Sequence, residues 1–152
     1  SGIFKKEGDG KGPIGLFKIG TGFGKDQQQI KWPYKQTNKN DIVIDDVNNN
    51  DYNRWLTPKG SRSSIKEKYS SFEWMLRQDH TYDLGFVVHH NTKPIYKSYG
   101  SAIFFHIWKT PFHPTAGCTA MDKNKMHYLL QWLKPNANPL ILQTPLSHLH
   151  FF

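Results

Sequence analysis

Residues 106–121 read HIWKTPFHPTAGCTAM, and this stretch says most about both the fold and the chemistry of the chain. It begins inside residues 101–108, a β-branched and aromatic run with the composition of a buried strand. It then passes through a loop of small residues to Cys118, twelve positions after His106. A histidine at the end of a strand and a lone thiol after a glycine are the components that nucleophilic catalysis needs.

Cys118 is the only cysteine, so it can form neither an intrachain disulfide nor a zinc site built from cysteine pairs. One interpretation is a buried, small, apolar side chain. The other is a nucleophile. Gly117 would leave room for a substrate carbonyl, and backbone N–H groups around Ala116 to Cys118 could form an oxyanion hole. A helix that begins near Lys123 would add its positive dipole close to that loop.

Two histidines could serve as the base for this thiol. His106 lies at the end of the hydrophobic strand, where a side chain is held firmly, and we prefer it for that reason. His113 lies only five residues before Cys118 and stays open as the alternative base. Its place in a loop beside Pro111 and Pro114 is more typical of an exposed and inert histidine.

Hydrophobic periodicity predicts the elements around this stretch. Strands are expected at residues 14–19, 42–44, 84–90, 101–108 and 139–143, with one or two short helices between 63 and 76, a long surface excursion from 20 to 41, and a tail from 147 to 152. The clearest helix follows Cys118, with Asp122 as its N-cap and Pro135 as its stop. The predicted fold is mainly β, a sandwich or barrel with a few peripheral helices, in a single domain covering residues 1–152.

The composition limits the partners. Lysine and arginine number 20 against 12 acidic residues, a formal net charge of +8 that favours a polyanion. Three arginines and no zinc-finger or RNA-binding signature argue against nucleic acid, whereas a bacterial cell wall would suit the charge. The sequence contains no apolar run of about 18 residues that could cross a membrane. We expect a monomer.

The remaining histidines are weak candidates for a metal site, and we expect no metal or other cofactor. His89 and His90 are consecutive in a predicted strand, so their side chains point to opposite faces and cannot both bind one metal from it. His148 and His150 have alternate spacing, but no cysteine or acidic partner stands nearby in the sequence.

Acidic and aromatic residues in the predicted loops have default structural roles. Asp45, Asp46 and Asp51 match neither an EF-hand nor a paired-carboxylate site, so solvated loop charges are expected. Three aromatic residues could stack on sugar rings or anchor long loops, and the sequence does not separate these two roles: Trp32, Tyr34 and Trp55.

Two motifs resemble the L,D-transpeptidase (YkuD-like) catalytic domain family. The family places a histidine before a Ser/Thr-x-Gly-Cys element, matched here by His106 and by residues 115–118, Thr-Ala-Gly-Cys. Its Gly-Asp-x-x-Thr-Pro-x-Gly-x-Phe entry into the sheet is similar to residues 7–17, EGDGKGPIGLF. The resemblance implies a β-rich domain of the bacterial cell envelope, outside the cytoplasm, that acts on peptidoglycan stem peptides. Cys118 would be its nucleophile and His106 its base, with Gly117 and Ala116 supporting the oxyanion.

The implied reaction begins with acylation of the cysteine by a stem tetrapeptide and the release of D-alanine. The acyl group then passes to an amine, or to water in an L,D-carboxypeptidase. Many members have a histidine before the Gly-Cys pair and an arginine two residues after the cysteine, where this chain has Ala116 and Ala120. Ile107 stands in place of the usual glycine after the catalytic histidine. A lysine, or one of Arg54, Arg62 and Arg77, could replace the missing arginine as the group that holds the substrate carboxylate.

Three other classes fit less well. Sortases also place a histidine before a cysteine, but they need a downstream arginine, and none follows Cys118. Papain-like peptidases reverse the order, which would pair Cys118 with His148, and the N-terminal nucleophile motif is missing. A wall-binding module without activity is the main alternative to an enzyme. It predicts that Cys118→Ser leaves peptidoglycan binding intact.

Overall fold

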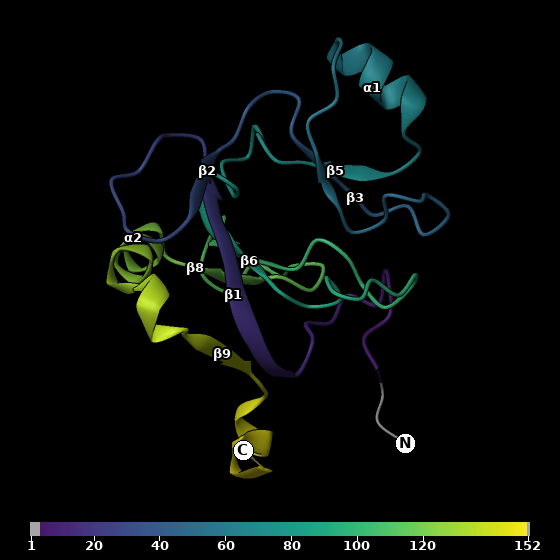
Figure 1. Ribbon diagram of the computed structural model, residues 1–152. Coiled ribbons are helices and arrows are strands. Elements are labelled where there is room, and N and C mark those ends of the chain that lie inside the picture. The colour runs from purple at the N-terminus through teal and green to yellow at the C-terminus, as the bar shows by residue number, and fades with distance from the viewer. Residues whose placement is uncertain (1–3, 152) are drawn as a thin grey trace.

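The computed structural model describes residues 4–151, except the side chains of residues 150 and 151. Its larger sheet has six strands, and the long strand β1 runs through its middle (Figure 1). The strand order is β2-β1-β6-β7-β8, and β9 pairs with the first part of β1. The bounds are β1 Gly15–Gly24, β2 Tyr34–Gln36, β6 Leu84–Val88, β7 Phe104–Ile107, β8 Thr119–Met121 and β9 Leu140–Gln143. The sheet is mixed. The strand β2 pairs with β1 in parallel and β8 pairs with β7 in parallel, whereas the other pairs are antiparallel.

The smaller sheet consists of three antiparallel strands in the order β4-β3-β5. They are β4 Trp55–Leu56, β3 Ile42–Ile44 and β5 Phe72–Trp74. The helix α1, Arg62–Lys68, connects β4 to β5 and buries Ile65 against Ile42 and Ile44. Ser61 caps this helix, since its side chain accepts a bond from Ser64 N–H.

Two apolar cores cover the two faces of the larger sheet. On one face the helix α2, Lys123–Trp132, buries Met126 and Leu130 against strand residues such as Phe86. On the other face a second core joins the two sheets and includes Phe23, Val43 and Phe104. The mainly β fold class predicted from the sequence is therefore confirmed, with both helices outside the larger sheet (Figure 1).

The N-cap of α2 agrees with the prediction, because the Asp122 carboxylate accepts bonds from the N–H groups of Asn124 and Lys125. The helix ends at Trp132, and Pro135 begins a short 3-10 helix, η1 Pro135–Ala137. A second one, η2 Leu146–Phe151, replaces much of the tail expected from 147 to 152, and residue 152 lies outside the described residues. In the described part of the chain, no helix is long and apolar enough to cross a membrane.

The expected surface excursion from 20 to 41 is wrong, because β1 continues to Gly24 and residues 34–36 form β2. The alternating glycines Gly20, Gly22 and Gly24 are more typical of a loop, which is why the sequence predicted one here. They let other groups approach the strand, and an added Cβ would lie 2.3 Å from the Asp83 carbonyl oxygen at Gly24 and 3.1 Å from the Tyr34 ring at Gly22. Glycine within a strand often marks such a close approach.

Two further predictions need correction, and two short strands were not predicted. Residues 63–76 contain one helix and then the strand β5, rather than helices alone. The strand expected at 101–108 is shorter, because β7 begins at Phe104 after Ala102 adopts a positive φ of 51°. The short strands β4 and β8 were not predicted, since two or three residues carry no detectable period.

Candidate active site

His106 lies in β7 and Cys118 lies immediately before the neighbouring strand β8, and the two side chains face the same side of the larger sheet. Strands β7 and β8 are parallel, with His106 opposite Ala120. Side chains alternate along a strand, so Cys118, two residues before Ala120, shares a face with His106. This face is turned toward the smaller sheet, because Phe104, two residues before His106, belongs to the core between the sheets.

A cavity of about 380 Å³ opens beside these two side chains. His113 and Ala116 also line it, so four of the five site residues singled out in the sequence meet there. Gly117 is not one of the lining residues. Much of the remaining wall is charged: Lys5, Glu7, Asp45, Glu73, Arg77, Asp79 and Lys109.

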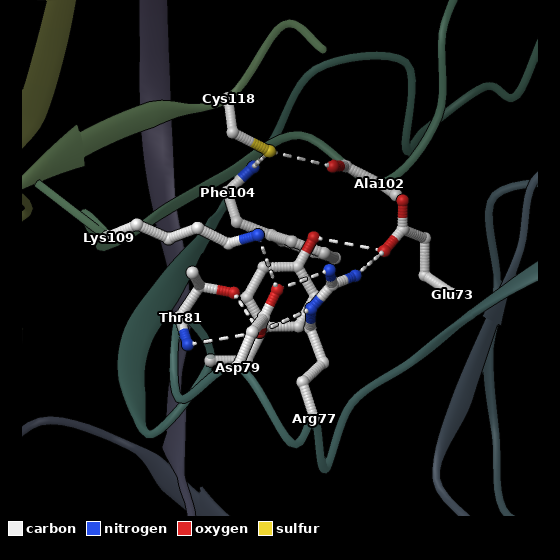
Figure 2. Close-up of polar contacts among 9 residues, drawn as sticks. Glu73, Arg77, Asp79, Thr81, Ala102, Phe104, Lys109 and Cys118 are labelled. Atoms are coloured by element: carbon white, nitrogen blue, oxygen red, sulfur yellow. Dashed lines mark hydrogen bonds and ion pairs between the residues drawn. The ribbon is translucent and has the colours of Figure 1, made fainter. Parts of the chain in front are cut away.

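The Cys118 sulfur lies between two backbone groups of the segment that leads into β7. The thiol donates to the Ala102 carbonyl oxygen at 3.3 Å, and Sγ accepts the Phe104 N–H at 3.4 Å (Figure 2). Burial raises the pKa of the thiol to about 12, and the Phe104 N–H acts in the opposite sense. Cys118 therefore rests as a neutral thiol at neutral pH.

The His106 imidazole is 7% exposed and is oriented by its own backbone. Nδ1 lies 2.8 Å from the Ile107 carbonyl oxygen. A carbonyl can only accept, so Nδ1 carries the proton and Nε2 keeps its lone pair. Burial lowers the pKa of this imidazole, which favours the neutral form that can act as a base. In the described part of the chain, no hydrogen bond joins the imidazole to the thiol.

His113 stands at the rim of the same cavity. Its side chain is exposed, in a turn closed by the bond from His113 N–H to the Thr110 carbonyl at 3.2 Å. The exposed position agrees with the expectation for a loop histidine. Its presence at the cavity keeps it a candidate base.

The loop before Cys118 is held by Thr115 and by the N-terminal segment. The Thr115 hydroxyl donates to the Cys118 carbonyl at 2.6 Å. Gly117 has a φ of 136°, and a Cβ there would lie 2.8 Å from the Lys11 carbonyl oxygen. The space beside Gly117 is therefore occupied by the chain itself, which explains why the two motifs of the sequence belong together.

A network of charged groups forms another wall of the cavity (Figure 2). The Arg77 guanidinium donates to both carboxylate oxygens of Asp79, at 2.9 and 2.7 Å, and to Glu73 at 3.0 Å. Lys109 Nζ lies 3.3 Å from Asp79. These bonds hold the pKa of Asp79 well below its usual range, whereas burial raises the pKa of Glu73. The Tyr82 hydroxyl also donates to Glu73, at 3.2 Å.

Of the three arginines considered as carboxylate ligands, Arg77 is the one that lines this cavity. Arg54 lies 3.7 Å from Asp51 and borders a separate groove. The Arg62 guanidinium stacks over the Trp74 ring at 4.3 Å. The sequence had no signal that would rank them, because residues 75–83 have neither a motif nor a period. Nor did the sequence predict that Glu73, Asp79, Tyr82 and Lys109 line this cavity.

The expectation of solvated loop charges is wrong for Asp45. This residue is half-buried, lines the cavity, and has a pKa that burial raises. Asp46 and Asp51 do behave as loop residues, since Asp46 accepts the Asn48 N–H at 2.9 Å and Asp51 pairs with Arg54.

The other histidines lie outside the cavity. His89 Nδ1 contacts the Thr92 hydroxyl at 3.1 Å, and His90 Nε2 contacts the Tyr99 carbonyl at 2.8 Å. His148 lies in η2, and the side chain of His150 is outside the described residues. Within the described residues, no three His, Cys, Asp or Glu side chains are grouped so as to hold a metal ion.

The aromatic candidates have structural contacts. Trp32 is buried, and its Nε1–H donates to the Gly20 carbonyl at 2.8 Å. The Tyr34 hydroxyl donates to the Asp26 carbonyl at 2.8 Å, and the Trp55 ring packs edge-on against Phe23. These contacts make all three residues anchors of the loops and strands around them.

A comparison with models of known protein families matches residues 1–142 of the chain. The matching model is YkuD, described as the L,D-transpeptidase catalytic domain. No curated protein and no solved structure matched the chain.

Proposed function

The chain belongs to the L,D-transpeptidase catalytic domain family, and on that premise we propose that Cys118 forms an acyl-enzyme with a peptidoglycan stem tetrapeptide. D-Alanine leaves in this step, and the acyl group then passes to an amine of a second stem. His106 is the base in both halves of the reaction. The observation that carries this proposal is that Cys118, just before β8, and His106, in the adjacent strand β7, line one cavity.

The chemistry begins from a neutral pair. His106 Nε2 accepts the thiol proton as Sγ attacks the carbonyl carbon of the stem peptide, which gives a tetrahedral oxyanion. The imidazolium then donates that proton to the departing nitrogen of D-alanine, and a thioester remains. The acceptor amine attacks the thioester and gives up a proton to Nε2, the C–S bond breaks, and the departing thiolate takes the proton from the imidazolium to become the thiol again. The Phe104 N–H, 3.4 Å from Sγ, stabilises the charge that develops on sulfur.

The oxyanion is assigned to backbone N–H groups of residues 116–118. Thr115 keeps this loop in place through its bond to the Cys118 carbonyl. The Thr115 hydroxyl oxygen also accepts the Gly117 N–H at 3.4 Å, and backbone groups held in this way need no rearrangement during the reaction. We assign Ala116 and Gly117 to this support, with Ala116 at the cavity wall.

We assign binding of the substrate carboxylate to the positively charged side chains of the cavity wall. Ala120 stands where many family members have an arginine, and its small side chain lines the cavity. Arg77 and Lys109 line the same cavity, and the described contacts use three of the five N–H groups of Arg77. Lys109, with its side chain 45% exposed, is the more accessible of the two.

The basic surface suits an enzyme of the cell envelope. A formal charge of +8 draws the protein toward the carboxylates and phosphates of a bacterial wall. We therefore place its activity outside the cytoplasm, in a single domain that acts as a monomer and needs no cofactor.

The experiment is incubation with a defined tetrapeptide muropeptide, followed by mass analysis of the products. A cross-linked dimer together with free D-alanine would support transpeptidation. Loss of D-alanine without a dimer would assign the chain to the second candidate, an L,D-carboxypeptidase. Unchanged substrate would overturn both, and binding to purified peptidoglycan that survives Cys118→Ser would then favour a wall-binding module.

Covalent labelling gives an independent check of the nucleophile. Carbapenems acylate members of this family, and an adduct on the intact protein is expected at Cys118. The control is Cys118→Ala, which removes the only thiol and must give no adduct. An adduct of the same mass on that variant would contradict the assignment.

A further inference from the structure

Residues 101–103 lie just before β7, and Ala102 contacts Cys118. Ala102 has a φ of 51°, in the left-handed region that a Cβ disfavours. The Ala102 carbonyl accepts the Cys118 thiol at 3.3 Å. Backbone strain of this kind persists only where neighbouring groups hold it, and it gathers at functional sites.

Asn53 is the group that holds Ala102. Its Oδ1 accepts the Ala102 N–H at 3.0 Å, and its Nδ2 donates to the Asn91 carbonyl at 2.8 Å. The Asn91 carbonyl accepts and the Ala102 amide donates, so the side-chain amide has one consistent orientation. The Asn53 N–H is bound in turn to the Ile44 carbonyl at 2.7 Å, which ties the side chain to strand β3.

The residue before Ala102 is held as well. The Ser101 hydroxyl donates to Glu7 at 2.7 Å, and the Tyr52 hydroxyl donates to the same carboxylate oxygen. The segment is therefore clamped from the N-terminal stretch at Ser101 and from β3 at Ala102. The two backbone groups on either side of the sulfur, the Ala102 carbonyl and the Phe104 N–H, cannot move independently of these clamps (Figure 2).

We propose that Asn53 is a positioning residue for the nucleophile. It holds Ala102 in the left-handed conformation and so directs the Ala102 carbonyl at the thiol. The hydrogen bond to this carbonyl keeps the thiol protonated and fixes the orientation of the Cys118 side chain until substrate enters. This inference rests on the proposed function, in which Cys118 is the attacking group. Asn53 does not touch the substrate and acts only through Ala102.

Loss of the contact between Ala102 and the thiol should have opposite effects on alkylation and on turnover. A carbonyl that accepts the S–H bond stabilises the thiol over the thiolate, so its loss lowers the thiol pKa and speeds alkylation. The same loss frees the sulfur to turn away from the carbonyl that it must attack, which slows turnover. Charged and titratable groups around the thiol, namely Lys5, Glu73, Arg77, Tyr82 and His106, stay in place when the uncharged Asn53 is changed.

The test compares Asn53→Ala with the unaltered protein in two assays. Alkylation by iodoacetamide between pH 6 and 10 is followed by intact mass, and the single cysteine makes the signal specific. We expect alkylation at pH 8 to rise about threefold, equal to half a pKa unit, as the thiol pKa falls. We expect kcat for D-alanine release to fall about tenfold, with KM nearly unchanged.

Two further variants separate positioning from a structural role. Asn40→Ala is the matched control, because the Asn40 amide also donates to two loop carbonyls, Pro58 at 3.0 Å and Gly60 at 3.1 Å, outside the cavity. It should leave both assays unchanged. In the double variant Asn53→Ala with Ala102→Gly, glycine adopts the left-handed conformation freely, so both values should return toward those of the unaltered protein.

Unchanged alkylation in Asn53→Ala, or alkylation and turnover that fall together and are not restored by Ala102→Gly, would overturn the inference. Equal effects from Asn40→Ala would do the same. If the unaltered protein releases no D-alanine, the proposed function fails. The alkylation comparison then decides the role of Asn53 by itself.

Discussion

At the scale of single residues, the site is built from neutral groups in a charged wall. The thiol has a pKa of about 12 and the buried imidazole has a lowered pKa, so neither carries charge at rest. Such a pair must transfer its proton during the attack rather than before it. The base therefore contributes to the rate directly, and its identity can be tested by substitution.

The first prediction concerns the base. His106→Ala should lower the turnover of a tetrapeptide muropeptide by about a hundredfold or more, because no other group at the strand end can take the thiol proton. His113→Ala is the matched control, since His113 lines the same cavity from an exposed turn. It should leave turnover within about twofold. Loss of turnover in His113→Ala, with turnover retained in His106→Ala, would reverse the assignment.

The second prediction concerns the substrate carboxylate. Lys109→Ala should raise KM about threefold to tenfold and leave kcat near its original value, because an exposed cation contributes mainly to binding. Stability should hardly change, since a surface ion pair such as that with Asp79 contributes little. Lys97→Ala removes an exposed lysine outside the cavity and serves as the control. A KM that rises equally in both variants would show that only net charge matters.

At the scale of elements, the loop before Cys118 depends on the contact between two backbones. Residues 115–118 pack against the N-terminal segment through glycines on both sides, since a Cβ at Gly12 would lie 3.1 Å from the Gly117 carbonyl oxygen. The strand β8 then fixes the loop to β7. Motifs a hundred residues apart in the sequence therefore form one structural unit.

The third prediction tests this contact. Gly117→Ala should lower the free energy of unfolding by about 2 kcal/mol or more, because the residue has a positive φ and its Cβ would lie 2.8 Å from the Lys11 carbonyl oxygen. Gly10→Ala is the control, because Gly10 also has a positive φ, 66°, but open space surrounds the position of its Cβ. It should cost about 1 kcal/mol. Urea denaturation measures both, and equal losses would mean that the Lys11 contact is unimportant.

At the scale of the whole molecule, the cavity lies where the core between the two sheets meets the charged wall. Phe104 and Tyr82 belong to that core, and the Tyr82 ring meets the His106 ring with centroids 5.2 Å apart. Burial of the imidazole is thus a product of the fold. It links the protonation of His106 to global stability.

The fourth prediction follows from this linkage. The folded state binds a proton at His106 less readily than the unfolded chain does, so its contribution is complete above the ordinary pKa of 6.5 and is lost as the pH falls below it. Asp45 and Glu73 act in the opposite sense, because their pKa values are raised, so the comparison must be made between variants. His106→Asn should flatten the fall in unfolding free energy between about pH 7.5 and 5.5.

The control for this measurement is His127→Asn, which changes an exposed histidine on α2. It should keep the pH dependence of the unaltered protein. Urea midpoints at several pH values provide the measurement. Equal slopes in His106→Asn and the unaltered protein would contradict the linkage.

Much of the fold could be predicted from the sequence, because the patterns that indicate it involve residues close together in the chain. The strand at residues 42–44 follows from its β-branched composition, and the helix capped by Asp122 follows from hydrophobic period and capping. These signals depend on neighbours in the chain. The continuation of β1 through its alternating glycines was not readable, because the groups that approach them come from distant parts of the sequence. Local rules assign glycine to loops, and only packing reverses that assignment.

The sequence by itself determined the mainly β class, the family, and the choice of Cys118 and His106 as candidates, since these depend on composition, order and motif. Only the tertiary structure decided what surrounds them. The Ile107 carbonyl orients the imidazole, Arg77 reaches the cavity while Arg54 and Arg62 do not, and Asn53 holds the Ala102 carbonyl against the thiol. These contacts join residues far apart in the chain. Their geometry exists only after the two sheets have packed, so no local pattern could encode it.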